Sequence, residues 1–216
     1  MLAARDPETG EGPASEKVRD QAATLIFGGF ETTARLLFCA SNMLALDPEE
    51  QARVRAEVRA LRPGSLARLD ELDAWPRLRM ALLEALRPYP PVPHLVREPR
   101  TADIIKGEAI PAKCQVWASP WVMHRHRAHW RHPTAFMPDR FAGQISPWTT
   151  NGAYFPFGAG PRICIAAVFA MAEAEIVLAW LSERYRMSLD DARPALPVGR
   201  LTIEPSRAPA FRLERA

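Results

Sequence analysis

The sequence predicts a mainly α-helical fold with a small antiparallel β-sheet. Segments with the composition of helices are found at about residues 15–46, 47–61, 76–87 and 166–185. Short β-favouring runs surround a Lys106-Gly107 turn within residues 102–120, and short strands are expected near 198–213. Residues 1–15 are expected to form a loop, and residues 124–156, which are rich in Pro, Trp and His, to be irregular.

The longest expected helix is apolar on nearly every face over residues 22–46. Its only charges there are Glu31 and Arg35, which are four residues apart and therefore share one face. A helix that is apolar all round either spans a membrane or passes through a large core. The two charges and the Gly28-Gly29 pair would be costly in a membrane, so we predict no membrane segment.

The next two helices have recognisable ends. Asp47 is a good N-cap, Pro48 suits the first helical position, and Glu50 completes a capping box. This second helix is expected to be amphipathic and to lie at the surface. The third is expected to stop at Pro88, where a proline-rich extended segment begins.

Cys164 stands directly before the last expected helix. The amino-terminal end of a helix carries partial positive charge and free N–H groups, which stabilise a thiolate. Gly158 and Gly160 permit sharp turns and close approach of the backbone to a flat ligand. Arg162 can pair with a carboxylate of that ligand, and Phe157 offers an apolar plane. A haem with its propionates needs this set of groups, and a cysteine thiolate can ligate its iron.

The alternative for Cys164 is a buried structural cysteine. That role is usual for an isolated cysteine, and we expect it for Cys39 and Cys114. A zinc site is not predicted, because no second Cys or His stands at ligand spacing from Cys164.

The segment Phe157-Gly158-Ala159-Gly160-Pro161-Arg162-Ile163-Cys164 resembles the haem-thiolate loop of the cytochrome P450 family. The family pattern, F-x-x-G-x-R-x-C-x-G, is long and specific. Its one departure here is Ala166, where the family usually has glycine, and we expect little effect from so small a residue. The resemblance implies haem b, iron protoporphyrin IX, with Cys164 as the axial ligand of the iron.

A second resemblance concerns ion pairs. Glu84-Ala85-Leu86-Arg87 is similar to the Glu-x-x-Arg motif of the family, and Pro138-Asp139-Arg140-Phe141 is similar to its P-E-R-F loop, with Asp for Glu. The resemblance implies that Glu84, Arg87 and Arg140 form one ion network that holds the irregular coil beneath the haem. Its role would be structural. Taken alone, a charge pair at this spacing is a common surface feature.

A third resemblance lies in the longest helix. Gly28-Gly29-Phe30-Glu31-Thr32-Thr33 is similar to the family's A/G-G-x-D/E-T-T/S motif. Two glycines inside a helix cost about 1 kcal/mol each relative to alanine, and close passage over the distal haem face would explain them. The resemblance implies that Thr32 hydrogen-bonds oxygen and water, and that Glu31 links them to bulk protons. The alternative is packing or surface roles for both side chains.

Two further groups of residues stand near these motifs. Arg97 matches the family's arginine at the start of the small sheet and is a second propionate candidate. The histidines at 124, 126, 129 and 132 are not predicted to bind a metal, because no carboxylate or cysteine joins them. We expect these histidines to be solvated or to cap helices.

The composition describes an ordinary globular chain. Of 216 residues, 48% are hydrophobic and 25% are charged, and the formal net charge of +3 does not indicate nucleic-acid binding. Three widely spaced cysteines argue against a disulfide scaffold and for a reducing compartment. The first twenty residues lack the apolar core of a signal peptide, so we expect a cytoplasmic protein.

The resemblance covers the chain from about residue 15 to its end. It implies that residues 1–216 form the carboxy-terminal part of the cytochrome P450 fold, from the long distal helix through the haem-thiolate loop to the final helix. The amino-terminal helices of the catalytic domain have no counterpart, so we expect a fragment, a truncated gene product or a shortened relative.

Three functions follow from the resemblance. The first is a monooxygenase, or the remnant of one, which inserts one oxygen atom into an apolar substrate with electrons from a ferredoxin or a flavoprotein reductase. The second is a non-catalytic fragment that binds haem or a partner chain. The third is a haem-thiolate isomerase or peroxygenase, against which the Glu31-Thr32 pair argues, since such relatives usually lack it.

Overall fold

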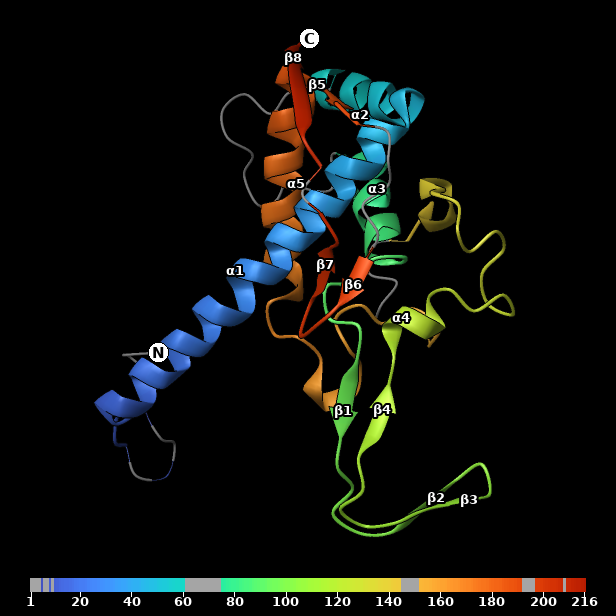
Figure 1. Cartoon of the computed structure of the whole chain (residues 1–216). Coiled ribbons are helices and arrows are strands. Elements are labelled where there is room, and N and C mark those ends of the chain that lie inside the picture. The colour runs from blue at the N-terminus through green and yellow to red at the C-terminus, as the bar shows by residue number, and fades with distance from the viewer. Residues whose placement is uncertain are drawn as a thin grey trace.

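A 32-residue helix, α1 (Ser15–Leu46), crosses the molecule, and its carboxy-terminal half packs against the other long helices (Figure 1). The computed structural model describes residues 5, 8, 10–60, 75–144, 152–191, 197–207 and 209–216. The side chains that α1 buries are Thr33, Leu36, Ala40 and Leu44. Their spacing of three or four residues places them on one face, which is the face that meets the core.

Three further helices agree with the predicted segments: α2 (Pro48–Ala60), α3 (Pro76–Leu86) and α5 (Ala167–Arg184). The single turn α4 (Pro120–Met123) was not predicted. Asp47 caps α2, because its Oδ1 accepts a hydrogen bond of 3.0 Å from the Glu50 N–H. The reciprocal half of the predicted capping box is wrong. The Glu50 carboxylate is buried and accepts a hydrogen bond of 2.6 Å from Arg77 Nε instead.

The core lies around α3, which contacts α1, α2, α5 and the 3₁₀ turn η2 (Pro138–Phe141). Seven of its eleven residues are buried, including both Glu84 and the leucines beside it. Aromatic side chains from the coil that follows the small sheet belong to this core, and the Phe141 and Tyr154 rings contact each other there in a tilted arrangement with centroids 4.9 Å apart. Because the interior around α3 is closely packed, the buried side chain of Glu84 is held in one position.

The first half of α1 is different. Residues 23–30 are all exposed, and they include the large apolar side chains of Leu25, Ile26, Phe27 and Phe30. In Figure 1 this half of the helix projects away from the other elements. The apolar surface that the sequence distributes around the helix is therefore left open along the first half, whereas most residues of the second half are at least half-buried.

Among the described residues, the strands form four separate antiparallel pairs rather than one sheet. They are β1 (Leu95–Arg97) with β4 (Val116–Ala118), β2 (Asp103–Ile105) with β3 (Glu108–Ile110), β5 (Tyr185–Leu189) with β8 (Phe211–Arg215), and β6 (Pro197–Gly199) with β7 (Ile203–Pro205). The predicted Lys106-Gly107 turn joins β2 to β3. Both residues have positive φ, 51° and 88°, as a two-residue hairpin turn of the primed type requires.

Some predictions fall on residues that the structure does not describe. These are residues 1–4, 6, 7 and 9 of the loop at 1–15, residue 61 at the end of the second helix, residues 145–151 of the irregular segment and residue 208 of the tail. The described parts of 124–156 contain the short 3₁₀ turn η2 but no strand, in line with the prediction of irregular coil. Within the described ranges, no helix combines the length and the apolar character that crossing a membrane would require.

Candidate active site

Cys164 lies exposed in a tight loop between the 3₁₀ turn η4 (Gly160–Arg162) and the start of α5. Backbone hydrogen bonds hold this loop. The Cys164 N–H donates to the Phe157 carbonyl over 2.9 Å, and the Ile163 N–H donates to the Gly160 carbonyl over 3.0 Å. The Ala167 N–H approaches the Cys164 carbonyl at 3.4 Å. The thiol is thus presented to the outside by a fixed backbone.

The glycines of this loop are required by its backbone conformation. Gly158 has φ of +80° and Gly160 has φ of +69°, a region that side chains rarely adopt. Space is not the reason, since a Cβ on Gly160 would meet no heavy atom within 4 Å. At Gly158 a Cβ would come 3.7 Å from Leu95 Cδ1, which is an ordinary contact. The half-buried Phe157 ring packs against the core and anchors the loop.

The two predicted propionate ligands are exposed cations. Within the described ranges, Arg162 makes no ion pair or hydrogen bond, and the Arg97 side chain donates only to the neighbouring Val96 carbonyl, over 2.9 Å. Neither guanidinium is neutralised by a carboxylate of the described chain. Both could therefore receive an anionic ligand in the bidentate geometry that arginine favours.

The structure brings Glu84, Arg87 and Arg140 together. Arg87 Nε and Nη2 each donate to the Glu84 carboxylate over 2.9 Å, and Arg140 Nε lies 3.3 Å from Glu84 Oε1. The Met137 N–H also donates to Glu84 Oε1, over 2.9 Å. The Glu84 and Arg87 side chains have no solvent exposure. The arrangement compensates two buried charges with paired hydrogen bonds, which is what makes such burial tolerable.

Arg87 also fastens the coil that follows α4. Its guanidinium donates to the carbonyls of His124, Pro133 and Ala135, over 2.9, 2.7 and 3.0 Å. Arg140 adds a hydrogen bond of 2.7 Å to the His132 carbonyl. This coil has little regular structure to satisfy its own carbonyls, and the network supplies the missing donors.

On α1, Thr32 bonds back to its own helix. Its Oγ1 donates to the Gly28 carbonyl over 2.7 Å. Gly28 and Gly29 face open space, since a Cβ on either would meet no heavy atom within 4 Å outside the local helix. The Thr32 hydroxyl oxygen can therefore still accept a hydrogen bond, next to the open surface at Gly28 and Gly29.

The Glu31 side chain contacts the carboxy-terminal tail rather than its own helix backbone. Its Oε1 accepts a hydrogen bond of 2.6 Å from Thr202 Oγ1 and lies 3.3 Å from Arg35 Nη2. The Thr202 hydroxyl is the main cause that lowers the pKa of Glu31, and Arg35 acts in the same direction against the effect of burial. Among the described residues, no hydrogen bond joins Glu31 or Thr32 to the Cys164 loop, although α1 and α5 pack together.

Comparison with known proteins identifies a family and several relatives that are similar to this chain. The family model described as Cytochrome P450 matches residues 1–207. Cyclooctatin synthase of Streptomyces melanosporofaciens is 35% identical over 87% of this chain and 41% of its own length. Cytochrome P450 4A10 of Mus musculus is 35% identical over 91% of this chain and 39% of its own length.

The chain belongs to the cytochrome P450 family. Solved structures agree: the cytochrome P450DA heme domain superposes with a TM-score of 0.87 at 32% identity, over the whole chain and 48% of its own. The cytochrome P450 named CYP102L1 gives a TM-score of 0.88 at 29% identity and is covered to 49%. The chain thus spans about two fifths of the curated relatives that it matches. The predicted fold, a carboxy-terminal part of the cytochrome P450 fold, is confirmed.

Members of the cytochrome P450 family carry haem, and the residues of this loop fit that group. The Cys164 thiol is accessible, and Arg162 and Arg97 have no carboxylate partner in the described chain. The open space around Gly160 leaves room for a flat ligand against the backbone. Among the described residues, no group of three or more His, Cys, Asp or Glu side chains is placed to hold a metal ion by itself.

His124 has a part in this cytochrome P450 structure that sequence reasoning missed. The prediction of a solvated histidine is wrong there, because the ring is fully buried, whereas the predicted capping role is confirmed at the carboxy-terminal end of α3, whose C-cap residue is Arg87. The His124 Nε2 accepts a hydrogen bond of 2.9 Å from the Phe155 N–H, so Nδ1 carries the proton that is donated to the Arg87 carbonyl over 3.1 Å. Burial lowers its pKa to about 4. Only the three later histidines, at 126, 129 and 132, are exposed as expected.

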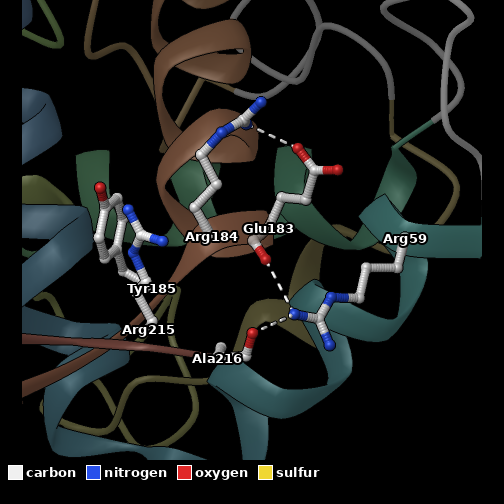
Figure 2. Close-up of a pocket in the computed structure, with 6 residues that line it drawn as sticks. All are labelled: Arg59, Glu183, Arg184, Tyr185, Arg215 and Ala216. Atoms are coloured by element: carbon white, nitrogen blue, oxygen red, sulfur yellow. Dashed lines mark hydrogen bonds and ion pairs between the residues drawn. The ribbon is translucent and has the colours of Figure 1, made fainter.

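Two other features lie apart from the cytochrome P450 site. Cys39 and Cys114 are half-buried, less enclosed than predicted, and desolvation raises the pKa of Cys39 to about 12. A pocket of about 420 Å³ lies between the end of α2, the end of α5 and the last residues of the chain (Figure 2). Arg59 in this pocket already donates to the carbonyls of Glu183 and Ala216, over 3.0 and 3.1 Å. None of its lining residues belongs to the predicted site.

Proposed function

We propose that this chain is the haem-binding part of a monooxygenase that inserts one atom of O2 into an apolar organic substrate. The observation that carries the proposal is the Cys164 loop, which presents an exposed thiol on a backbone fixed by two positive-φ glycines. Haem b, when bound through that thiolate, would supply the chemistry of oxygen activation, which electron donation from the sulfur favours.

The loop would perform three tasks in this function. The amino-terminal end of α5, just after Cys164, would place its partial positive charge and free N–H groups near the sulfur that ligates the iron. Arg162 and Arg97 would hold the two propionates of the haem. The Phe157 ring, packed on the core, and the hydrogen bond from the Cys164 N–H to its carbonyl would keep the sulfur in position.

Thr32 and Glu31 would handle protons. Because the Thr32 hydroxyl donates to the Gly28 carbonyl, its oxygen is left to accept a hydrogen bond from a group or water beside the bare glycines. Glu31 is charged and partly open to solvent, so it can collect a proton and pass it inward. The pair favours a monooxygenase over a haem-thiolate isomerase or peroxygenase.

An electron-transfer partner would bind an acid-poor surface. Residues 109–138 contain no Asp or Glu, and the exposed side chains of Arg127 and Arg131 lie in this segment together with three exposed histidines. The segment connects to the Cys164 loop through the hydrogen bond between the Phe155 N–H and His124. A small acidic ferredoxin or the flavin domain of a reductase has complementary charge. The three unpaired cysteines, all among the described residues, support a cytoplasmic location.

A second candidate function is a non-catalytic fragment that binds haem or a partner chain. It is favoured by the exposed apolar face of α1, where Phe30 is 80% exposed. A closed site protects reactive intermediates from water, and an open haem face would not.

One experiment separates the two. Residues 1–216 and a chain extended by the amino-terminal half of a relative such as cyclooctatin synthase are each loaded with haem and supplied with ferredoxin, reductase and a panel of apolar organic substrates. The monooxygenase proposal predicts oxygenated product from the extended chain, with one O2 consumed per product. If both chains bound haem but neither formed product, the result would contradict the monooxygenase proposal and support the non-catalytic, haem-binding function.

A further inference from the structure

The turn between β6 and β7 lies against the middle of α1, at Glu31. Thr202 in this turn is 5% exposed, and its hydroxyl donates to Glu31 Oε1 over 2.6 Å. The two residues are 171 positions apart in the chain. A short, nearly buried hydrogen bond to a carboxylate at such separation is a tertiary contact, set by the fold rather than by local sequence.

Arg35 extends this contact into a chain of alternating charges. Its Nη2 lies 3.3 Å from Glu31 Oε1 and 3.3 Å from Glu204 Oε1, so one guanidinium joins an acid of α1 to an acid of β7. Arg200 Nε completes the series at 3.5 Å from Glu204 Oε2. The side chains of Glu31, Arg35 and Glu204 are about one third exposed, so solvent screens these pairs in part.

The position of the turn is fixed independently of Glu31. The Ile203 N–H donates to the Pro91 carbonyl over 2.9 Å, which ties the turn to the extended segment after α3. Within the turn, the Arg200 N–H donates to the Thr202 carbonyl over 3.0 Å. The hydroxyl of Thr202 is therefore held in place by the tail and does not merely follow the carboxylate.

We propose that the turn between β6 and β7, together with the start of β7 (residues 200–204), is a latch on Glu31, which orients its carboxylate and sets how readily it takes up a proton. Thr202 and Arg35 are then positioning residues for the proton supply that we assign to Glu31. The inference rests on the function proposed above. It adds to that function a means of control, because any ligand or partner that moves this turn also releases the acid.

The electrostatics of Glu31 agree with a latch. Its pKa is lowered first by the Thr202 hydroxyl and then by Arg35, while burial acts in the opposite direction. In the described structure, the charged groups that face Glu31 are Arg35 on its own helix and, beyond it, Glu204 and Arg200 of the tail. While the Thr202 hydrogen bond is in place, the pKa of Glu31 is lowered and its carboxylate takes up a proton less readily. Without the Thr202 hydrogen bond, its affinity for a proton rises.

The test is an NMR titration of the Glu31 carboxyl carbon in the 216-residue chain, with the signal assigned from its loss in Glu31→Gln. Thr202→Val removes the hydroxyl at nearly constant shape, and we expect a resolvable upward shift of the Glu31 midpoint. Thr202→Ser keeps the hydroxyl and should keep the wild-type midpoint. Thr24→Val is the matched control, because that hydroxyl, also on α1, donates to the Asp20 carbonyl instead.

An unchanged midpoint in Thr202→Val, or an equal shift in Thr202→Ser, would overturn the latch. Should Thr202→Val fail to fold, Arg35→Gln tests the same contact from α1, with an upward shift predicted and an unchanged midpoint contradicting it. The titration needs no haem. Its failure therefore leaves the role of Cys164 standing, and failure of haem binding leaves the latch standing.

Discussion

Arg87 binds the Glu84 carboxylate in a bidentate ion pair, in which Nε and Nη2 each donate a hydrogen bond over 2.9 Å, and neither side chain is exposed to solvent. The pair joins α3 to a coil that has few hydrogen bonds of its own, through carbonyls at three separate positions. The pair is one of the links between the core and the segment that leads to Cys164.

We expect Glu84→Ala to lower the free energy of unfolding by about 3–5 kcal/mol, because it leaves the Arg87 charge buried without its partner. Urea unfolding followed by circular dichroism measures the change. Glu49→Ala is the control, since the ion pair of Glu49 with Arg53 is largely exposed and should contribute below about 1 kcal/mol. Equal losses in the two variants would contradict a structural role for the Glu84 network.

His124 should make the chain sensitive to acid. The pKa of a histidine in the unfolded chain is near 6.5 and that of folded His124 is about 4, so the unfolded state binds the extra proton first. Stability is complete above pH 6.5 and is lost as the pH falls toward 4, by about 3 kcal/mol in total. Unfolding free energies at pH 7 and pH 5 test this.

The variant His124→Asn should lose less stability than wild type over that pH interval, because it has no ring to protonate. His126→Asn, at an exposed histidine, is the control and should follow wild type. If His124→Asn and wild type showed the same pH dependence, the buried neutral ring would be excluded as the cause.

In a completed enzyme, Thr32→Ala should uncouple electron consumption from product formation by about tenfold or more, as loss of a proton-transfer group does. Haem affinity should hardly change, because Thr32 is predicted to face oxygen. Thr32→Ser should retain most of the coupling. The measurement is the ratio of product formed to electrons consumed from the redox partner. Unchanged coupling in Thr32→Ala would place Thr32 among packing residues.

The chain alone should associate and should not turn over substrate. Leu25, Ile26, Phe27 and Phe30 form an exposed apolar face on α1, and such faces promote association. Sedimentation velocity should show oligomers for wild type, and a larger monomer fraction for Phe30→Glu with Ile26→Glu. A monomer with one tightly bound haem and well-coupled hydroxylation would contradict this expectation and make the chain a minimal enzyme.

Local signals in the sequence predicted local structure well. Asp47 and Pro48 marked the start of α2, and the Lys106-Gly107 turn marked the β2–β3 hairpin, because capping and turn geometry depend on neighbouring residues. The loop at 157–164 was recognisable because its glycines must stand where φ is positive. These features could be predicted because few residues determine each of them.

Contacts between distant segments could not be predicted in the same way. Nothing near His124 in the sequence shows that its ring is buried between the Arg87 carbonyl and the Phe155 N–H. The hydrogen bond from Thr202 to Glu31 depends on how the tail returns to α1. Likewise, Glu50 pairs with Arg77 rather than with its own helix end because tertiary packing brings a better partner.

The central claim is that Cys164 holds the haem iron, and the reduced carbon-monoxide spectrum of the haem-loaded chain tests it most directly. Wild type should give the thiolate-type band, and Cys39→Ser and Cys114→Ser should keep it. Cys164→Ser should abolish the band while the chain keeps its helical circular dichroism. A thiolate-type band that survives in Cys164→Ser, or that disappears in Cys39→Ser or Cys114→Ser instead, would contradict the account.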